Sequence, residues 1–216
     1  MVNDGFKEKG LRQKLVKEIT EKGIKSEKVI NAIGKIPRHL FMDSAFVNFA
    51  YVDKAFPIGS GQTISQPYTV AFQTELLQIK KGDKVLEVGT GSGYQTAVLI
   101  ELGAKVYTIE RQRELFQKTQ HFLPKLGYNP QFFYGDGYIG KPTYGPYNKI
   151  LITAGAPEIP KKLIEQLKPG GVLVVPLGTS VQTMTRITKT EKGEIEKEEF
   201  GKFSFVPLLK GVAKDR

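Results

Sequence analysis

Three acids and three glycines are the residues of this sequence whose types and spacing could do chemistry together. Each acid lies at or beside the end of an apolar run that predicts a β-strand: Glu87, Glu110 and Asp136. The glycines alternate with other residues directly after the first of these runs: Gly89, Gly91 and Gly93. Ligands of open α/β folds bind at the carboxyl ends of the strands, and glycines let a ligand approach the backbone closely. We therefore expect a small-molecule site at this edge, although any one acid alone could be a solvated loop residue.

The chemistry of the expected ligand follows from the same residues. The glycines do not complete the Gly-x-Gly-x-x-Gly fingerprint that places a pyrophosphate at a helix N-terminus. An acid at Glu87 would repel a phosphate but could pair, directly or through water, with a cationic amino-acid head. Glu110 could hold a ribose diol, and Asp136 could accept from an adenine amino group beside the amide of Gly137. S-adenosylmethionine carries all three groups and no phosphate, so the pattern favours a methyltransferase over a plain strand-to-helix turn.

The elements that must position these residues are predicted from hydrophobic periodicity. Nearly continuous apolar runs indicate strands buried on both faces of a parallel sheet. Strands are predicted at 85–88, 106–109, 132–134, 149–153 and 171–176, the last after a turn at 169–171. Helices are predicted at 67–79, 95–102, between Glu110 and Gly127, and at 159–167. This alternation indicates an α/β, doubly wound, mostly parallel, Rossmann-like sheet.

The two ends of the chain have a different pattern. Amphipathic helices are predicted at 11–22 and from an N-cap at Ser26 to just before Pro37. The segment 38–66 is aromatic and without clear period, and a long irregular segment in a compact domain is usually functional. Beyond Gly178, runs at 181–190 and 194–200 predict a hairpin, and 202–206 a further strand. We expect one domain over 1–216, with an N-terminal helical and substrate-side segment (1–66), a cofactor-binding α/β core (67–178) and C-terminal antiparallel strands (179–216).

Composition limits the alternatives. The chain has 216 residues. It contains no cysteine, which excludes disulfides and thiolate chemistry, and its two histidines are too few for a histidine-based metal site. No apolar run approaches membrane-spanning length, and the first residues lack the apolar region of a signal peptide, so a soluble, cytoplasmic monomer with no membrane partner is expected. The net charge of +10 could indicate nucleic acid. However, the lysines are dispersed, often beside glutamates, which favours solvated faces and no specific nucleic-acid partner.

A second group of residues, Gly61–Pro67, contains Ser65 just before the proline that opens a predicted helix. From the residues alone, capping of this helix is the favoured role for Ser65. The sequence offers no serine-based catalytic triad, because Ser92 is only part of the glycine loop and no histidine lies in a recognisable motif.

These stretches resemble the protein-L-isoaspartate O-methyltransferase family, whose members repair aged proteins. The matching stretches, in family order, are Pro37-Arg38 with Phe41, Ala50–Asp53, Gly61–Tyr68, Leu86–Tyr94, Gly135–Gly140, Gln166–Gly171 and Phe205–Leu208. The glycine loop is shared by many methyltransferases, whereas Gly-x-Thr-Ile-Ser-x-Pro is specific to this family. Two departures are Asn148, where the family usually has aspartate, and Leu209, where some members carry a hydroxyl.

The resemblance implies a class I methyltransferase sheet and a protein repair reaction. A methyl group would pass from S-adenosylmethionine to the free α-carboxylate of L-isoaspartyl residues in damaged proteins and peptides, giving the methyl ester and S-adenosylhomocysteine. The resemblance moves Ser65 to the active site as a group that orients the carboxylate. The resemblance, together with the interpretation of the glycine loop and the three acids given above, indicates the expected cofactor contacts. They are Gln62, Thr63, Ile64, Ser65, Glu87, Gly89, Gly91, Ser92, Glu110, Asp136 and Gly137. The expected substrate contacts are Tyr51, Val52, Asp53, Val206, Pro207 and Leu208.

Two rival functions follow from other features. The net charge suggests a class I methyltransferase acting on RNA or a small molecule, which would need a basic stripe with aromatic residues near the cofactor. The segment 38–66 has the aromatic residues, but Arg38 and Lys54 are nearly its only cations. A non-catalytic module that kept the nucleoside fold would be expected to lose the Ser65 motif or one of the three acids, and this sequence has them all.

Overall fold

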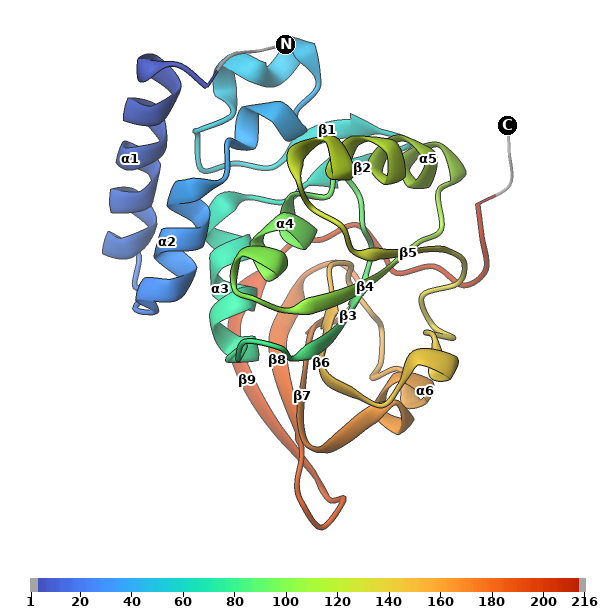
Figure 1. Ribbon diagram of the computed structural model, residues 1–216. Coiled ribbons are helices and arrows are strands. Elements are labelled where there is room, and N and C mark those ends of the chain that lie inside the picture. The colour runs from blue at the N-terminus through green and yellow to red at the C-terminus, as the bar shows by residue number, and fades with distance from the viewer. Residues whose placement is uncertain (1–3, 214–216) are drawn as a thin grey trace.

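A seven-stranded sheet forms the centre of the computed structural model, which describes residues 4–213 (Figure 1). Its strands are β3 (Lys84–Val88), β4 (Lys105–Glu110), β5 (Gln131–Tyr134), β6 (Tyr147–Ile152), β7 (Leu167–Leu177), β8 (Gln182–Lys189) and β9 (Ile195–Phe203). They lie in the order β5-β4-β3-β6-β7-β8-β9, with parallel pairing from β5 to β7 and antiparallel pairing of β8 and β9. The predicted sheet, mostly parallel with antiparallel strands at its C-terminal end, is confirmed.

Helices cover both faces of this sheet and add a further layer on one side. They are α1 (Phe6–Glu21), α2 (Glu27–Lys35), α3 (Pro67–Leu77), α4 (Tyr94–Glu101), α5 (Arg113–Phe122) and α6 (Lys161–Glu165), with short 3-10 helices η1 (Arg38–Phe41), η2 (Ser44–Phe49), η3 (Leu123–Leu126) and η4 (Pro142–Tyr144). Two short strands, β1 (Phe56–Gly59) and β2 (Gln62–Ile64), form a separate hairpin. Figure 1 shows α1 and α2 outside α3 and α4, on the side away from α6.

The central strand β3 is buried on both faces, and its alternation assigns each side chain to one of them. Leu86 and Val88 pack in the cluster that contains Leu163 of α6. Val85 packs with Leu99 of α4 in the cluster on the opposite face. Side chains at every second position of a strand share a face, so Glu87 lies on the α4 side with Val85.

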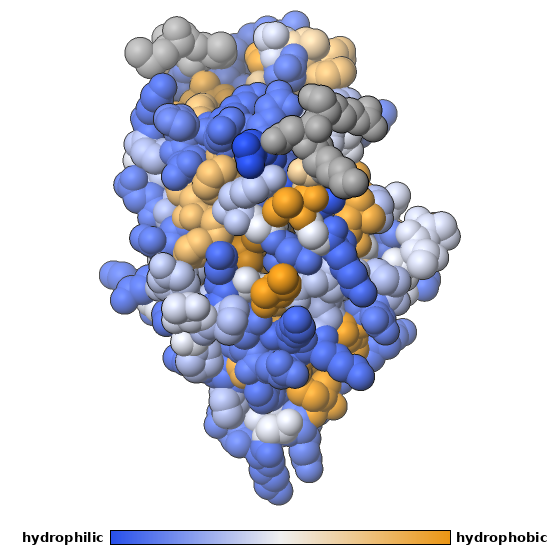
Figure 2. All heavy atoms as spheres, turned by 90° about the vertical axis from the view of Figure 1, so that its right-hand side faces the viewer, coloured by the Kyte–Doolittle hydropathy of each residue, from blue (hydrophilic) through white to orange (hydrophobic). Residues whose placement is uncertain are grey.

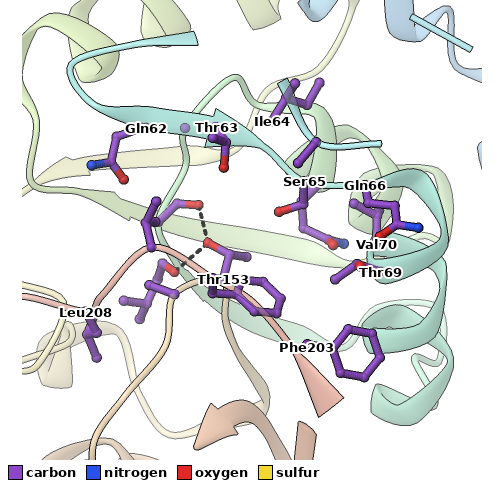
Figure 3. A pocket seen from close by; sticks show the side chains of 18 of the residues that line it. Gln62, Thr63, Ile64, Ser65, Gln66, Thr69, Val70, Thr153, Phe203 and Leu208 are labelled. Atoms are coloured by element: carbon purple, nitrogen blue, oxygen red, sulfur yellow. Dashed lines mark hydrogen bonds between the residues drawn. The ribbon is translucent and has the colours of Figure 1, made fainter. Parts of the chain in front are cut away.

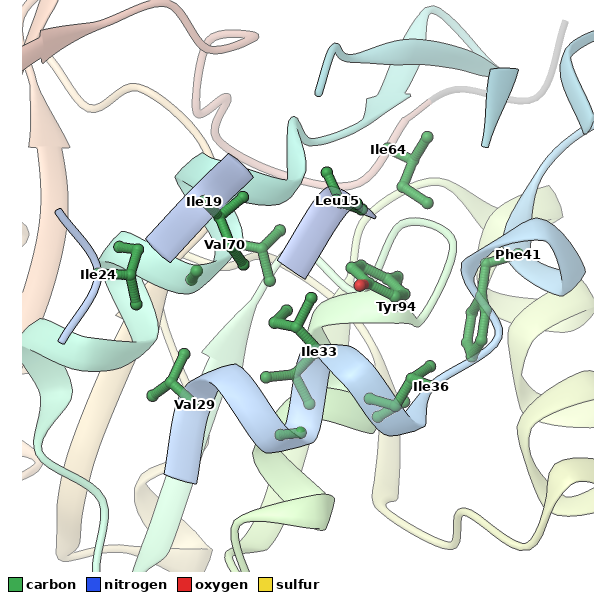
Figure 4. Packing of buried hydrophobic residues seen from close by; sticks show 14 of the residues in the cluster. Leu15, Ile19, Ile24, Val29, Ile33, Ile36, Phe41, Ile64, Val70 and Tyr94 are labelled. Atoms are coloured by element: carbon green, nitrogen blue, oxygen red, sulfur yellow. The ribbon is translucent and has the colours of Figure 1, made fainter. Parts of the chain in front are cut away.

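The outer helices attach to the sheet through a large apolar cluster. Leu15 and Ile19 of α1 and Ile33 of α2 are buried against side chains of α3 and α4, among them Val70 and Tyr94 (Figure 4). Each such side chain contributes roughly 1.5–3 kcal/mol when fully buried. The predicted ends of α2 are confirmed: the Ser26 hydroxyl accepts from an amide in the first turn, and the helix ends at Lys35, before Pro37.

Two N-terminal segments are more regular than predicted. α1 begins at Phe6 instead of residue 11, because the carboxylate of Glu8 reaches back to accept from the amide of Gly5 at 3.1 Å. The segment 38–66 contains η1, η2 and the β1–β2 hairpin, whose turn needs positive φ at three consecutive residues, Gly59 to Gly61. No hydrophobic period marks these short elements, which explains why the sequence pattern missed them.

The C-terminal part differs from prediction in two places. β7 begins at Leu167 instead of after the Pro169-Gly170-Gly171 turn, and a register shift against β6 accommodates the extra residues. The strand predicted at 202–206 does not form: β9 continues to Phe203, and the chain then leaves the sheet. Residues 204–208 run beside the loop after β6, where Gly155 donates to the Val206 carbonyl and accepts from the Leu208 amide, both at 2.8 Å.

The surface agrees with a chain that is a quarter charged. Figure 2 shows one face of the molecule, where hydrophilic residues predominate and the hydrophobic ones lie in small separate groups. Between residues 4 and 213, no helix is both long and apolar enough to cross a membrane.

The close packing of Gly93 yields a stability prediction with a built-in control. Gly93 and Gly127 both have positive φ, 83° and 85°, but a Cβ on Gly93 would lie 2.8 Å from Thr119, whereas a Cβ on Gly127 would meet nothing within 4 Å. Gly127→Ala should cost the ~1–2 kcal/mol of left-handed backbone alone. Gly93→Ala should cost a further ~1–3 kcal/mol from overpacking. Urea unfolding of both variants checks this, and equal losses would contradict it.

Candidate active site

A cavity of about 990 Å³ opens at the carboxyl edge of the parallel strands. It is bounded by the glycine loop after β3, the end of β4, the β2–α3 connection and the C-terminal segment after β9. Most of the predicted site residues line it: Gln62, Thr63, Ile64, Ser65, Gly89, Gly91, Ser92, Glu110, Gly137, Val206, Pro207 and Leu208. In Figure 3, the hairpin residues lie on one side and Thr153 and Leu208 on the other, with open space between them.

The glycine loop has a shape that only glycine supports at its first position. Gly89 has φ 100°, and a side chain there would collide with the hydroxyl of Thr153. That hydroxyl donates to the carbonyls of Val88 and Gly89, at 3.0 and 2.8 Å. Thr153 therefore fixes the start of the loop from the end of the neighbouring strand β6, and it also lines the cavity.

Glu110 ends β4 as an almost fully buried carboxylate at the cavity wall. One oxygen accepts from the Gly91 amide at 2.9 Å and the other from the Gln112 amide at 2.8 Å. Burial raises the pKa of Glu110, and the backbone amides that bind its charged form oppose this rise. The same carboxylate thus shapes the glycine loop and presents an acid to the cavity.

Glu87 does not line the cavity, in contrast to its predicted contact with a cationic head. Its side chain is fully buried under α4, where Thr96 and Thr108 donate to one carboxylate oxygen at 2.5 and 2.7 Å. Burial raises the pKa of Glu87 to about 8, partly offset by the two hydroxyls. Strand alternation explains the placement, because Glu87 shares the α4 face of β3 with Val85. Thr108 links Glu87 to the cavity-lining Thr90, since the hydroxyls of Thr108 and Thr90 lie 2.6 Å apart.

Asp136 also lies outside the cavity lining, although its neighbour Gly137 is part of it. One carboxylate oxygen accepts from the Tyr138 amide at 2.8 Å, and the other from the Gly211 amide at 2.7 Å. The second bond ties the C-terminal segment to the end of β5. Asp136 therefore shapes the loop that brings Gly137 to the cavity.

Ser65 lines the cavity, and its hydroxyl points into the open space in Figure 3. It does not cap α3. The N-cap position is Gln66, which makes no side-chain capping bond, and the amide of Tyr68 in the first turn donates to Asp53 at 2.8 Å. Within residues 4–213, no protein group forms a hydrogen bond with the Ser65 hydroxyl. The capping role favoured from the residues alone is therefore not the one this fold gives it.

The predicted substrate contacts divide into two groups. Val206, Pro207 and Leu208 line the cavity, whereas Tyr51, Val52 and Asp53 do not. The Tyr51 hydroxyl lies 3.0 Å from an Arg12 nitrogen and 2.7 Å from His39 Nδ1, in a network that joins α1 to η1. Val52 is partly exposed on the surface, and Asp53 is bonded to the start of α3.

Several lining residues were missed by sequence reasoning. Thr153 follows a predicted strand at the same edge as the three acids, so that edge rule could have found it. A second group of missed residues forms an extension of the cavity beside the end of β9 and the start of α3: Tyr68, Thr69, Val181, Gly201, Lys202, Phe203, Ser204 and Phe205. No sequence signal brings these two segments together. In the described part of the chain, no group of three or more His, Cys, Asp or Glu side chains is placed to hold a metal ion.

The buried Glu87 yields a pH prediction. The folded state keeps the proton of Glu87 up to about pH 8, whereas an exposed glutamate loses it near 4.5. Stability from this group is therefore fully present below about pH 4.5 and is lost as pH rises through about 8. Glu87→Gln, which is neutral throughout, should lack this loss, so its stability relative to wild type should rise by up to ~1.4 kcal/mol per pH unit across that window.

Urea unfolding at about pH 5 and about pH 8 measures this difference. Glu196→Gln, at an exposed position of β9, controls for the general effect of removing an acid. A constant offset between wild type and Glu87→Gln at both pH values would contradict the prediction.

Comparison with known proteins places the chain in a family. The family model for protein-L-isoaspartate(D-aspartate) O-methyltransferase matches residues 10–213. A protein-L-isoaspartate O-methyltransferase of Christiangramia forsetii is 65% identical over 96% of this chain and 98% of its own length. One of Flavobacterium psychrophilum is 60% identical with the same coverage.

Solved structures agree. A protein-L-isoaspartate O-methyltransferase superposes with a TM-score of 0.81 at 29% identity, covering 91% of this chain and 65% of its own. A Plasmodium falciparum protein assigned to the same activity, solved in complex with S-adenosyl-L-homocysteine, has a TM-score of 0.78 at 25% identity over 92% of this chain and 98% of its own. The resemblance of the motifs is thus confirmed over nearly the whole length, and the chain belongs to the protein-L-isoaspartate(D-aspartate) O-methyltransferase family.

Proposed function

We propose that this protein transfers a methyl group from S-adenosylmethionine to the free α-carboxylate of L-isoaspartyl residues in damaged proteins and peptides. The observation that carries the proposal is one cavity with two kinds of wall. One wall is the glycine loop with Glu110, and the other contains the Ser65 hydroxyl, to which no protein group of residues 4–213 forms a hydrogen bond. The names of relatives 65% and 60% identical over nearly their full length support the same activity.

The lining residues fit a nucleoside cofactor without phosphates. Among residues 4–213, Arg111 and Lys202 are the only cationic side chains in the lining, and the Arg111 Nε already donates to the Gly211 carbonyl at 3.1 Å. The acid in this lining is Glu110, whose largely buried carboxylate suits the hydroxyls of a ribose. A pyrophosphate would find an acid here instead of a cluster of positive charges.

We assign the glycine-loop side of the cavity to the cofactor. In this assignment, Glu110 holds the ribose, Gly137 lies beside the adenine, and Gly89, Gly91 and Ser92 border the amino-acid part. Gln62, Thr63 and Ile64 close the site from the hairpin. Glu87 and Asp136 act from outside the cavity by supporting the strand and the loop. A crystal structure with S-adenosylhomocysteine tests these contacts, and a ribose placed away from Glu110 would reject its role.

The reaction asks little acid–base chemistry of the protein. When bound, S-adenosylmethionine supplies a methyl group on a sulfonium ion, so a C–O bond forms to the substrate carboxylate as the C–S bond breaks, leaving a neutral thioether and a methyl ester. The substrate carboxylate is already ionised at pH 7, so no general base is needed. The protein contributes alignment, worth up to ~7–11 kcal/mol in well-oriented systems. Ser65 donates a hydrogen bond that directs one carboxylate oxygen, and Val206, Pro207 and Leu208 border the substrate.

The finer features predicted from the sequence stay predictions. They are a cytoplasmic monomer without a specific nucleic-acid partner, and a division into a substrate-side segment (1–66), a cofactor-binding core (67–178) and C-terminal strands (179–216). The small number of cations in the cavity supports a protein substrate over RNA.

Labelled methyl transfer tests the proposed reaction directly. The protein should transfer methyl from S-adenosylmethionine to a peptide containing one L-isoaspartyl residue and not to the aspartyl twin of the same sequence. The two peptides differ only in which carboxylate is free, so the comparison isolates that group. Equal labelling of both peptides, or of neither, would reject the assignment.

The Ser65→Ala variant tests the orienting role of the hydroxyl. It should lower kcat/KM for the isoaspartyl peptide roughly ten- to hundredfold, the scale of one hydrogen bond to a charged group, with little change in S-adenosylhomocysteine affinity. Ser65→Thr should retain partial activity, because the donor survives. Ser26→Ala, which removes the N-cap of α2, is the matched control and should cost roughly 1 kcal/mol of stability without changing methyl transfer. Wild-type kinetics for Ser65→Ala would end the orienting role.

A further inference from the structure

Asp53 is a buried carboxylate that binds three separate partners beside the active site. Its side chain is 2% exposed. Oδ1 accepts from the Tyr68 amide at 2.8 Å, and Oδ2 accepts from Gln66 Nε2 at 2.9 Å and from Lys22 Nζ at 2.6 Å. Asp53 does not line the cavity, so these bonds give it a role that needs no direct contact with the substrate.

Two partners of Asp53, Gln66 and Tyr68, lie just after Ser65 in the chain. Gln66 directly follows Ser65, and Tyr68 is the second residue of α3. Pro67 between them fixes its own φ and has no N–H to give. Asp53 therefore holds the chain on the C-terminal side of Ser65 at two points, one on a side chain and one on the backbone.

The same carboxylate replaces the missing cap of α3. Gln66 occupies the N-cap position without a side-chain capping bond. A carboxylate at a helix N-terminus satisfies a free amide and interacts favourably with the helix dipole. Asp53 performs this task from a turn between η2 and β1, so Ser65 is left free of it.

We propose that Asp53 is a positioning residue for methyl transfer, holding the Ser65–Tyr68 segment so that the Ser65 hydroxyl meets the substrate carboxylate. The inference deepens the proposed function and rests on it. Loss of the two bonds would let the segment shift, and a displacement of about 1 Å can cost on the order of a hundredfold in rate. Binding of the cofactor on the glycine-loop side should be affected far less.

Lys22 offers a way to separate positioning from simple charge pairing. Lys22 is 42% exposed on the side chain and shares its ammonium with Glu18 at 2.6 Å. Removing this charge leaves the bonds from Gln66 and Tyr68 in place. If Asp53 acts through the segment that carries Ser65, Lys22→Met should be close to wild type in turnover.

The central experiment is steady-state kinetics with an isoaspartyl peptide on Asp53→Asn and Lys22→Met, with S-adenosylhomocysteine affinity measured on each by calorimetry. Asparagine keeps an acceptor for the Tyr68 amide but turns an NH₂ group toward Gln66 and Lys22. Asp53→Asn should lose roughly ten- to hundredfold in kcat, with a smaller change in KM and an unchanged S-adenosylhomocysteine Kd. Lys22→Met should lose less than about twofold.

A polarity-reversed pair supplies the rescue. In the double variant Asp53→Asn with Gln66→Glu, the amide NH₂ can donate to the new carboxylate, which restores the bond beside Ser65 with its direction reversed. Its kcat should recover part of the loss. If Asp53→Asn does not fold, Asp53→Glu takes its place, because it keeps the charge and displaces the carboxylate by one methylene. Its kcat should lie between those of wild type and Ser65→Ala.

The outcomes are separable. An inactive wild-type protein would reject the proposed reaction, and this inference with it. An active wild type with full kcat in Asp53→Asn, or in Asp53→Glu if that variant is used, would reject the positioning role alone. Equal losses of kcat in Lys22→Met and Asp53→Asn would assign the effect to the ion pair between Lys22 and Asp53. A loss of S-adenosylhomocysteine affinity in Asp53→Asn that parallels its loss of kcat would assign the effect to a general disturbance of the site. Either result would overturn the proposal.

Discussion

The hydrogen bond from the Gly91 amide to the Glu110 carboxylate is the interaction on which the site depends. It joins the loop after β3 to the end of β4 at 2.9 Å, and the second oxygen of Glu110 accepts from the residue before α5 at 2.8 Å. An unpaired carboxylate at this depth would be costly, so the two amides allow an acid to be buried there. To bring the Gly91 amide to this carboxylate, the loop takes positive φ at Gly89, Gly91 and Gly93. This backbone shape explains why glycines occupy alternate positions.

The parallel core could be predicted from the sequence because its signal is local. Apolar runs such as 85–88 identify buried strands, and the end of each run marks the edge where the cavity lies. Strand alternation, which is also local, places the Glu87 side chain inside the protein and away from the cavity lining. The alternation that buries Val85 against α4 sends Glu87 to the same face, whereas the residue after the strand, Gly89, reaches the cavity. Position at the edge indicates a site, and position within the strand decides which side chains can enter it.

The N-terminal and C-terminal contributions could not be predicted from local patterns, because long-range polar contacts place them. The Arg38 guanidinium is fully buried, donates to the Lys54 carbonyl at 3.4 Å and lies 4.8 Å from the ring centre of Tyr94, the first residue of α4. Burial lowers the pKa of Arg38 to about 10, and the aromatic ring offsets part of the cost of burying a cation. The Phe205 amide similarly donates to Gln182 Oε1 at 2.8 Å, which directs the chain from β9 toward the cavity. No periodicity indicated that these segments belong to the site; the irregularity of 38–66 pointed to a functional N-terminal segment, and the family resemblance indicated both segments.

The acids around the cavity show how orientation is achieved without acid–base groups. Glu87, Asp136 and Asp53 are all predicted ligand contacts, and none of their side chains lines the cavity. Each accepts hydrogen bonds from protein groups: from two threonines, from two amides, and from the start of α3. A reaction whose nucleophile is itself a carboxylate has reason to keep other carboxylates at a distance, because like charges at 4 Å repel by about 4 kcal/mol near a protein surface. Acids engaged with the backbone can hold the walls in place without competing for the methyl group. The fold thus engages these three carboxyl groups in the frame of the site, holds Glu110 at the cavity wall with backbone amides, and leaves the neutral hydroxyl of Ser65 in the cavity lining.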